Sequence, residues 1–367
     1  MTNAFLTPDV IAREALMLLS NNTVATNLVH RDRAQEFSGM AVGDTVTIRR
    51  RTNFEVKEFA GSISNQEVTE QGVPLQLEKH YDISVPLTSK DLTLELEDFS
   101  SQIVAPAMLA MAEKVDSYIY SLADQIPSIV ERSASDLALR DVARVDGQLL
   151  TQKVPLANRS GLVGPGMKVD LMSLDSFHRA EQRGDDGTAL REASMGRVMG
   201  VNWYGAQGVS EHTAGTAVGA SALAINGAAF AKGDTKVNIN GASGTETLVK
   251  GDVLKIAGSG QHVVTETSTA SGGAFTDVKI YPALRGDLVD GAAVTTYASH
   301  DMNIAGDMNG ISLAVVPLAL PMEAGRGATM SWNGLSVRVV TGYDQSSKKD
   351  IVSFDLLCGG KVTQPEL

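Results

Sequence analysis

The chain has 367 residues, of which 43% are hydrophobic and 20% charged, so it can form two or three domains with cores and is not intrinsically disordered. Its formal net charge is -12, and this lack of basic excess argues against tight nucleic-acid binding. A single cysteine excludes an intramolecular disulfide, the N-terminal residues lack a secretory signal, and no run approaches the roughly 20 apolar residues that span a membrane.

The first predicted element is an amphipathic helix from residue 8 to about residue 22. Thr7 suits the N-cap and Pro8 the first helical position. Ile11, Ala15 and Leu18 fall on one face. The helix is interpreted either as an arm that docks on a neighbouring copy or as an edge helix of the core.

A long polar ribbon follows. Residues 42–52 and 81–88 predict two strands that enclose an acidic excursion, and the first strand ends in a basic cluster. A lone hairpin is marginally stable at best, so we expect this ribbon to lie on another copy of the chain, with a solvated loop as the alternative. The basic cluster could touch nucleic acid, but the neighbouring acids favour ion pairs across a subunit boundary. The candidate interface residues are Arg49, Arg50, Arg51, Glu55, Glu58, Glu67 and Glu70.

The strongest periodic pattern predicts a long helix from about residue 97 to residue 126. Apolar residues recur there at steps of three or four, which places them on one helix face. Pro106 is expected near the first turns or at a kink, and Pro127 supports the end. The predicted buried face consists of Val104, Met108, Met111, Val115, Tyr118, Leu122 and Ile126.

Helices and strands then alternate. The patterns predict helices at 135–150 and 175–183, a buried strand at 168–174, and strand structure near 197–209 with a bulge at Gly200. Further strands are predicted beyond residue 300, at 312–317, 335–341 and 351–357, with Gly359 and Gly360 ending the last one.

Residues 213–300 have a different composition. Short runs rich in Val and Thr alternate with turn signals such as Asn240-Gly241 and Asp290-Gly291, at a spacing of about ten residues. This pattern predicts a small all-β barrel or sandwich inserted into the mixed fold.

Sequence motifs for catalysis are missing. The chain contains no GxxxxGK[ST] phosphate loop, no HExxH and no GxSxG, and its six histidines are not at metal-ligand spacing. Cys358 lies in a strand pattern and is expected to be a buried, inert thiol. We therefore predict a protein that is not an enzyme and has no cofactor, metal or catalytic residue. Two alternatives are a carbohydrate-binding or adhesin-like module in residues 213–300, and a hydrolase that uses His178, Asp185 or Asp186.

The order of these elements resembles the major coat proteins of tailed bacteriophages, of the podovirus coat type with an inserted β-domain on the Hong Kong 97-type capsid fold. The segments that carry the resemblance are GDTVTIRRR, VPLTSKDLTLELEDFSSQIVAPAMLAMAEKVDSYI, GRVMGVNWYGAQGV and GGKVTQPEL. The resemblance covers nearly the entire chain.

The resemblance implies an α+β capsid fold divided along the chain. Its parts would be an N-arm (1–35), an extended loop and peripheral domain with the spine helix (36–134), a first axial part (135–212), the inserted β-barrel-like domain (213–300), and a second axial part that returns to the peripheral domain (301–367).

The resemblance also implies a function. Copies of the chain would assemble into pentons and hexons of an icosahedral shell that encloses double-stranded DNA without binding it specifically. A scaffolding protein and a portal would be its partners, with assembly in the host cytoplasm and a final place in the virion capsid. We expect neither the N-terminal helix nor the ribbon to pack against the rest of its own molecule.

Overall fold

The structure is a computed structural model that describes residues 8–31, 45–50, 56, 58, 72–87, 100–132, 136–179, 188–219, 222–227, 230–320, 327–344 and 349–367. The chain divides into two compact units. The first contains residues 1–115 and 309–364, and the second contains residues 116–308 and 365–367. None of the described helices is long and apolar enough to cross a membrane.

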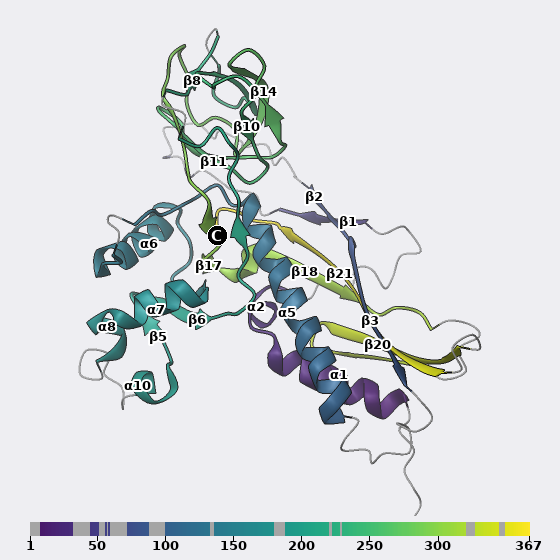
Figure 1. The fold of residues 1–367 in the computed structure, drawn as a ribbon. Coiled ribbons are helices and arrows are strands. Elements are labelled where there is room, and N and C mark those ends of the chain that lie inside the picture. Colours follow the sequence, from purple (N-terminus) through teal and green to yellow (C-terminus); the bar gives the residue numbers. More distant parts are fainter. Residues whose placement is uncertain are drawn as a thin grey trace, which may run out of the picture. The chain divides into compact units, whose positions relative to one another are not determined.

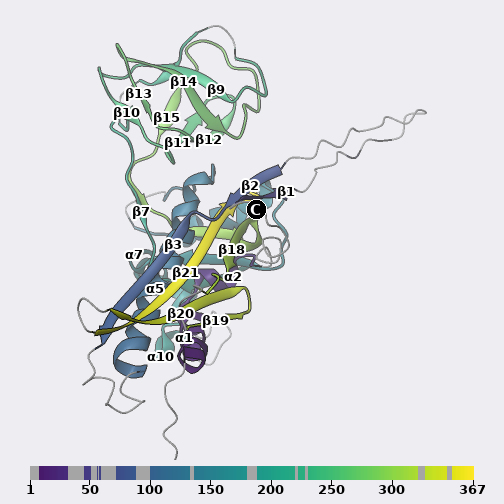
Figure 2. The same cartoon turned by 90° about the vertical axis from the view of Figure 1, so that its right-hand side faces the viewer.

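The first unit is built on a sheet around one long strand, β21 (Lys349–Val362). Its neighbours are β18 (Ile311–Val316), β20 (Leu335–Asp344) and β3 (Lys79–Leu87), all antiparallel, and β19 (Gly327–Trp332) follows β20 at the edge. Figure 2 shows β3, β21, β20 and β19 side by side. Strand β21 is the centre because its apolar side chains, Phe354, Leu356 and Cys358 among them, are almost completely buried.

The two predicted strands of the ribbon do not pair with each other. Strand β1 (Thr45–Arg49) pairs with β2 (Gly72–Gln76), and the predicted strand 81–88 is β3, which pairs with β21 instead. The burial pattern gives the reason. Ile48 of β1 and Leu75 of β2 are buried together with Ala314 of β18, so this pairing buries apolar surface that a long polar hairpin leaves in water.

The prediction that Gly359 and Gly360 end the last strand is wrong, because β21 continues through both to Val362. A side chain at Gly359 would place its Cβ 2.1 Å from the carbonyl oxygen of Gln76. Glycine is therefore required by the close approach of another backbone segment and does not mark a turn.

The N-terminal helix is present as α1 (Pro8–Asn22), with the predicted start. It packs against β19 and β20 of its own chain and buries Ile11, Ala15 and Leu19. The expectation that this helix does not pack against its own molecule is wrong. The interpretation as an edge helix of the core holds. The short helix α2 (Ala25–Leu28) follows, and His30 then bridges to Ser312 of β18.

The long helix is split into three types of turn. A π-helical turn (η2, Ser100–Val104) precedes α5 (Ala105–Ser121), and a 3₁₀ turn (η3, Leu122–Gln125) follows it. The change at residue 105 has a cause in Pro106, which has no N–H to continue the α-helical ladder. All predicted face residues from Val104 to Leu122 are buried, which confirms the periodicity, whereas Ile126 lies beyond the helix in extended backbone.

The second unit contains a small mixed sheet in the order β17-β4-β6-β5. Its strands are β17 (Ile304–Asp307), β4 (Arg159–Val163), β6 (Val201–Gly205) and β5 (Gly196–Val198). The helices of this part of the chain are α6 (Leu139–Thr151), α7 (Pro165–Ser173), α8 (Asp175–His178) and α10 (Thr188–Glu192). Phe177 and Trp203 meet edge to face in the core between them, with ring centroids 6.4 Å apart.

Two predictions in this region are wrong. Residues 168–173 belong to helix α7 and Leu174 is its C-cap, because Pro165 at the first position starts a helix and the buried strand is β4 just before it. Gly200 is no bulge. Met199 and Gly200 both have positive φ, 52° and 76°, and form the tight turn that joins β5 to β6.

The predicted strands between residues 213 and 300 form a separate all-β structure (Figure 1). Its main sheet has the order β15-β11-β12-β14-β9-β8, and a bridge between Ala224 and Ala293 brings the two edges together, so the sheet closes on itself. Phe275, Ile239 and Leu254 are completely buried inside it. The strands are β8 (Ala224–Ile225), β9 (Lys236–Asn240), β10 (Thr247–Leu248), β11 (Val253–Ile256), β12 (Gly260–Val264), β13 (Ser268–Thr269), β14 (Ala274–Tyr281) and β15 (Val294–Thr296).

Candidate functional site

The base of the ribbon is anchored by strand pairing and a small apolar cluster. Strands β1 and β2 pair over five residues, and on the buried side Ile48 and Leu75 contact Ala314 and Leu77. Val56, within the excursion, is 97% exposed, and Glu58 is exposed as well. An apolar side chain this exposed gains almost no hydrophobic stabilisation from its own chain.

The predicted interface residues have different surroundings in the structure. Arg49 is exposed at the end of β1, whereas the Arg50 side chain donates a hydrogen bond from Nε to the carbonyl oxygen of Thr363, at 2.8 Å. Arg50 thus joins the ribbon base to the C-terminal segment of its own chain. Four of the predicted residues, Arg51, Glu55, Glu67 and Glu70, lie outside the described residues.

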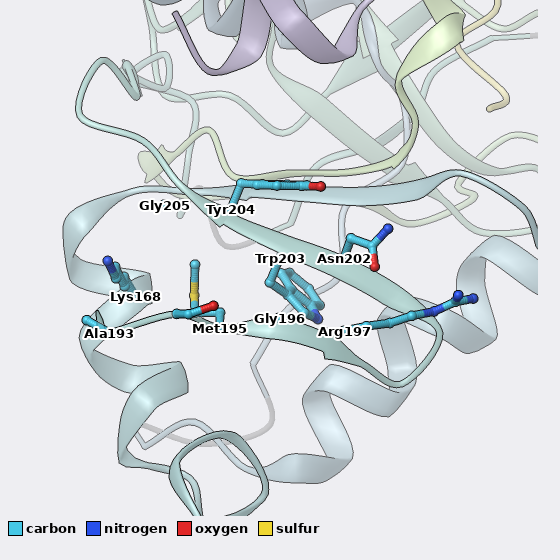
Figure 3. A pocket seen from close by; sticks show the side chains of 10 residues that line it. Lys168, Ala193, Met195, Gly196, Arg197, Asn202, Trp203, Tyr204 and Gly205 are labelled. Carbon is cyan, nitrogen blue, oxygen red and sulfur yellow. The ribbon is translucent and has the colours of Figure 1, made fainter. Parts of the chain in front are cut away.

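A pocket of about 360 Å³ lies in the second unit between α7, β5 and β6 (Figure 3). Lys168 lies at one end of it and Arg197 at the other, with Asn202 and the Tyr204 ring between them. None of the described residues that line this pocket is Asp, Glu, His or Cys. These described residues suit an anionic or polar group.

The Trp203 indole in this pocket is a structural group. Its Nε1–H donates to the carbonyl oxygen of Val198 at 3.2 Å, and the side chain is 5% exposed. A buried indole whose only donor is satisfied this way contributes packing and fixes the β5–β6 turn.

The residues of the hydrolase alternative do not form a described site. Asp185 and Asp186 lie outside the described residues. The His178 ring hydrogen-bonds through Nδ1 to the carbonyl oxygen of Leu174, at 3.0 Å, within α8. Its Nε2 lies 3.6 Å from Asp175, so this histidine caps its own short helix.

The structure brings together a pair of histidines that the sequence did not group. His212 and His300 face each other across two very short strands, β7 (Glu211–His212) and β16 (His300–Asp301), with ring centroids 5.6 Å apart. Asp124 and Asp252 flank His212. Because these groups come from distant chain segments, no spacing in the sequence indicates them. Within the described ranges, no group of three or more such side chains has metal-binding geometry.

Cys358 is completely buried in β21, and burial raises the pKa of its thiol to about 12. We expect iodoacetamide to leave Cys358 unmodified in the native protein at pH 8 and to modify it fully in denaturant, measured by intact mass. The reason is that the thiolate is the nucleophile and the folded chain keeps the neutral thiol. Rapid labelling of native protein would contradict this placement.

The same shift has a consequence for stability. The unfolded thiol ionises near its ordinary pKa of 9.0, while the folded thiol stays protonated to about 12. The contribution of the buried thiol to stability is therefore present below pH 9.0 and is lost as pH rises through this interval.

Comparisons with known proteins show the fold. No protein-family model and no curated protein matches the chain. Among solved structures, one titled Mycobacterium phage Che8 aligns with a TM-score of 0.51 at 16% identity, covering 94% of this chain and 89% of that one. The capsid structure of the cyanophage P-SCSP1u aligns with a TM-score of 0.45 at 10% identity, covering 94% and 86% of the two chains. The mature capsid of bacteriophage PhiM1 aligns with a TM-score of 0.45 at 11% identity, covering 94% and 85%. The likeness to the Che8 phage structure confirms the α+β fold that the sequence resemblance implies.

Proposed function

We propose that this chain is the major capsid protein of a tailed bacteriophage and that copies of it assemble into the icosahedral shell around the double-stranded DNA genome. The observation that carries the proposal is the shared fold with a phage structure over nearly the full length of both chains, despite 16% sequence identity. A fold alone does not dictate function, so the inference also draws on features of this chain.

The ribbon supports assembly. Its base is anchored by a small buried cluster and the hydrogen bond from Arg50 to Thr363, and its exposed residues include Val56 and Glu58. A contact between a ribbon and a different surface of the next copy is heterologous, and such contacts generate closed rings when the rotation between copies closes. Pentons and hexons are rings of this type.

The electrostatics fit a container. The net charge of -12 repels the DNA polyanion, so the inner surface does not bind the packaged genome tightly. Single exposed ion pairs contribute up to about 1 kcal/mol each, but pairs repeated at every boundary set the register between copies. A scaffolding protein that guides curvature and a portal at one vertex complete this proposal, with assembly in the host cytoplasm.

Electron microscopy tests the proposal. We expect the purified chain, expressed alone or with the scaffolding protein of its phage, to form closed shells of uniform diameter in negative stain. Sedimentation velocity is expected to show subunits and particles with few intermediates, because ring closure is cooperative. A chain that remains monomeric under both conditions would contradict the proposal.

A further inference from the structure

The chain enters and leaves the all-β structure, residues 213–299, through the strand pair β7–β16. In this pair His212 lies opposite His300, and Glu211 lies opposite Asp301. Two residues on each strand form a weak connection by themselves. The side chains around His212 contribute to this connection, beside the backbone hydrogen bond from Met302 N–H to the Ser210 carbonyl and the hydrogen bonds between Gln261 and Ile129.

His212 is 6% exposed and lies between two carboxylates. Its Nε2 is 2.9 Å from Asp252 Oδ1, and its Nδ1 is 3.4 Å from Asp124 Oδ1. Asp252 lies in the loop before β11, inside the all-β structure, while Asp124 lies in η3 after the long helix. Lys250 and His300 also face Asp124. One imidazole thus joins three separate segments of the chain.

The hydrogen bonds of Asp252 show which group is the donor in its contact with His212. Asp252 is 2% exposed, and its carboxylate accepts backbone N–H groups from Val249, at 2.7 Å, and from Gly215, at 3.2 Å. Both oxygens of this carboxylate therefore act as hydrogen-bond acceptors. His212 Nε2 must therefore carry a proton and donate it to Asp252.

The contact between His212 Nδ1 and Asp124 Oδ1 requires a second proton. In a neutral imidazole whose Nε2 is protonated, Nδ1 has only a lone pair, and here it faces the Asp124 carboxylate. Asp124 Oδ1 is buried and makes no hydrogen bond, and burial raises the pKa of this carboxyl group, an effect that the nearby cations oppose. A proton between Nδ1 and Oδ1 turns this contact into a charge-assisted hydrogen bond, and its loss leaves two acceptors face to face.

The packing places the backbone of Gly251 against one side of this contact. Gly251 has a φ of +98°, and a Cβ there would lie 2.9 Å from both Asp124 Oδ1 and His212 Cε1. The backbone of the all-β structure is therefore seated directly on the His212–Asp124 contact. Repulsion at this contact acts on that backbone.

We propose that His212, Asp124 and Asp252 form a proton-operated latch that holds the β7–β16 connection closed when the His212–Asp124 contact is protonated and loosens it when that proton is lost. The inference does not depend on the proposed function, since every group belongs to one chain. It assigns a role to a cluster outside the ribbon and the pocket.

The test is hydrogen–deuterium exchange of the intact chain, kept in one assembly state at every pH. Amide protection in peptides that cover residues 211–216 and 298–302 is compared from about pH 5 to about pH 8, the range in which histidine changes charge, after correction for intrinsic exchange. We expect protection to fall about tenfold as pH rises, in line with the loss of one charge-assisted hydrogen bond. Protection that is constant or increases with pH would overturn the proposal.

The variant Asp124→Asn separates the latch from general destabilisation. The asparagine amide supplies a permanent donor to Nδ1, so protection is expected to stay high up to about pH 8. His300→Gln is the control and should retain the pH dependence of the wild-type chain. A profile for Asp124→Asn that parallels the wild type would refute the latch, and the wild-type profile decides the matter by itself if that variant does not fold.

His262 provides an internal contrast. It is completely buried in the all-β structure, and desolvation lowers its pKa. Its contribution to stability is present above its ordinary pKa of 6.5 and is lost as pH falls, the opposite direction to the latch. The sign of the pH dependence at residues 211–216 therefore distinguishes the two groups.

Discussion

A chain in which residues 52–70 are replaced by a short Gly-Ser linker is expected to fold normally and to form no closed particles. The substitution retains β1 and β2, so Ile48 and Leu75 keep their buried contact with Ala314. It removes the ribbon segment that we assign to the subunit boundary, including the exposed residues Val56 and Glu58. A contact worth about 1.4 kcal/mol changes an association constant tenfold, and a closed shell multiplies that factor over all its boundaries.

The boundaries of this replacement matter. A deletion that extends to residue 78 would also remove β2 and expose the apolar side chain of Ile48. Such a variant would confuse loss of assembly with loss of folding. A linker of the same length as the wild-type segment is the matched control, since it tests side-chain chemistry at constant reach.

The measurements are circular dichroism for folding, and sedimentation velocity with negative-stain microscopy for assembly. We expect both linker variants to melt close to the wild-type temperature and to sediment as subunits. Shells of normal size and yield from the short-linker chain would exclude the ribbon as an assembly element.

Arg159→Met is expected to reduce the free energy of unfolding of the second unit by about 3 kcal/mol, the low end of the range for breaking a buried ion pair. Arg159 is 1% exposed and uses three nitrogens: Nη1 to Asp146 at 2.6 Å, Nη2 to the carbonyl of Val154 at 2.6 Å, and Nε to the carbonyl of Pro155 at 3.0 Å. Methionine fills part of the volume and satisfies none of these acceptors. The low end applies because the Asp146 side chain is one-third exposed.

Urea denaturation followed by tryptophan fluorescence measures this loss, since Trp203 lies in the core of the same unit. Arg179→Met is the control, because Arg179 and Asp175 form a pair, 3.3 Å apart, in which both side chains are at least half exposed. Its removal should change stability by less than about 1 kcal/mol. Adding Asp146→Asn to Arg159→Met should restore part of the loss. Equal effects of Arg159→Met and Arg179→Met would show that the buried pair has no special role.

Local patterns determined much of this fold. The start of α1 at Pro8, the buried face of the long helix from Val104 to Leu122, and the all-β character of residues 213–300 all follow from periodicity and turn residues. Each of these depends on residues within a few turns of one another. Neighbours in the chain therefore carry the information, and the sequence displays it directly.

The candidate interface was only partly accessible from the sequence. The ribbon was predicted as an exposed element, and the described residues Val56 and Glu58 are exposed. Arg50 was grouped with Arg49 and Arg51 by adjacency, yet its hydrogen bond goes to Thr363, over 300 residues further along the chain. A charge cluster in the sequence does not reveal where the partner of each member lies in the folded chain.

Pairing between distant segments was decided by the tertiary structure. Whether strand β1 pairs with β2 or with β3 depends on which arrangement buries Ile48 and Leu75, and Gly359 is explained by a backbone that approaches from residue 76. The His212 cluster joins residues 124, 212 and 252 in the same way. The sequence by itself determined which segments are helical, extended or exposed, because those properties come from short-range geometry. Which segments meet was set by the burial of apolar surface and the satisfaction of buried polar groups over the folded chain, and no local pattern encodes that choice.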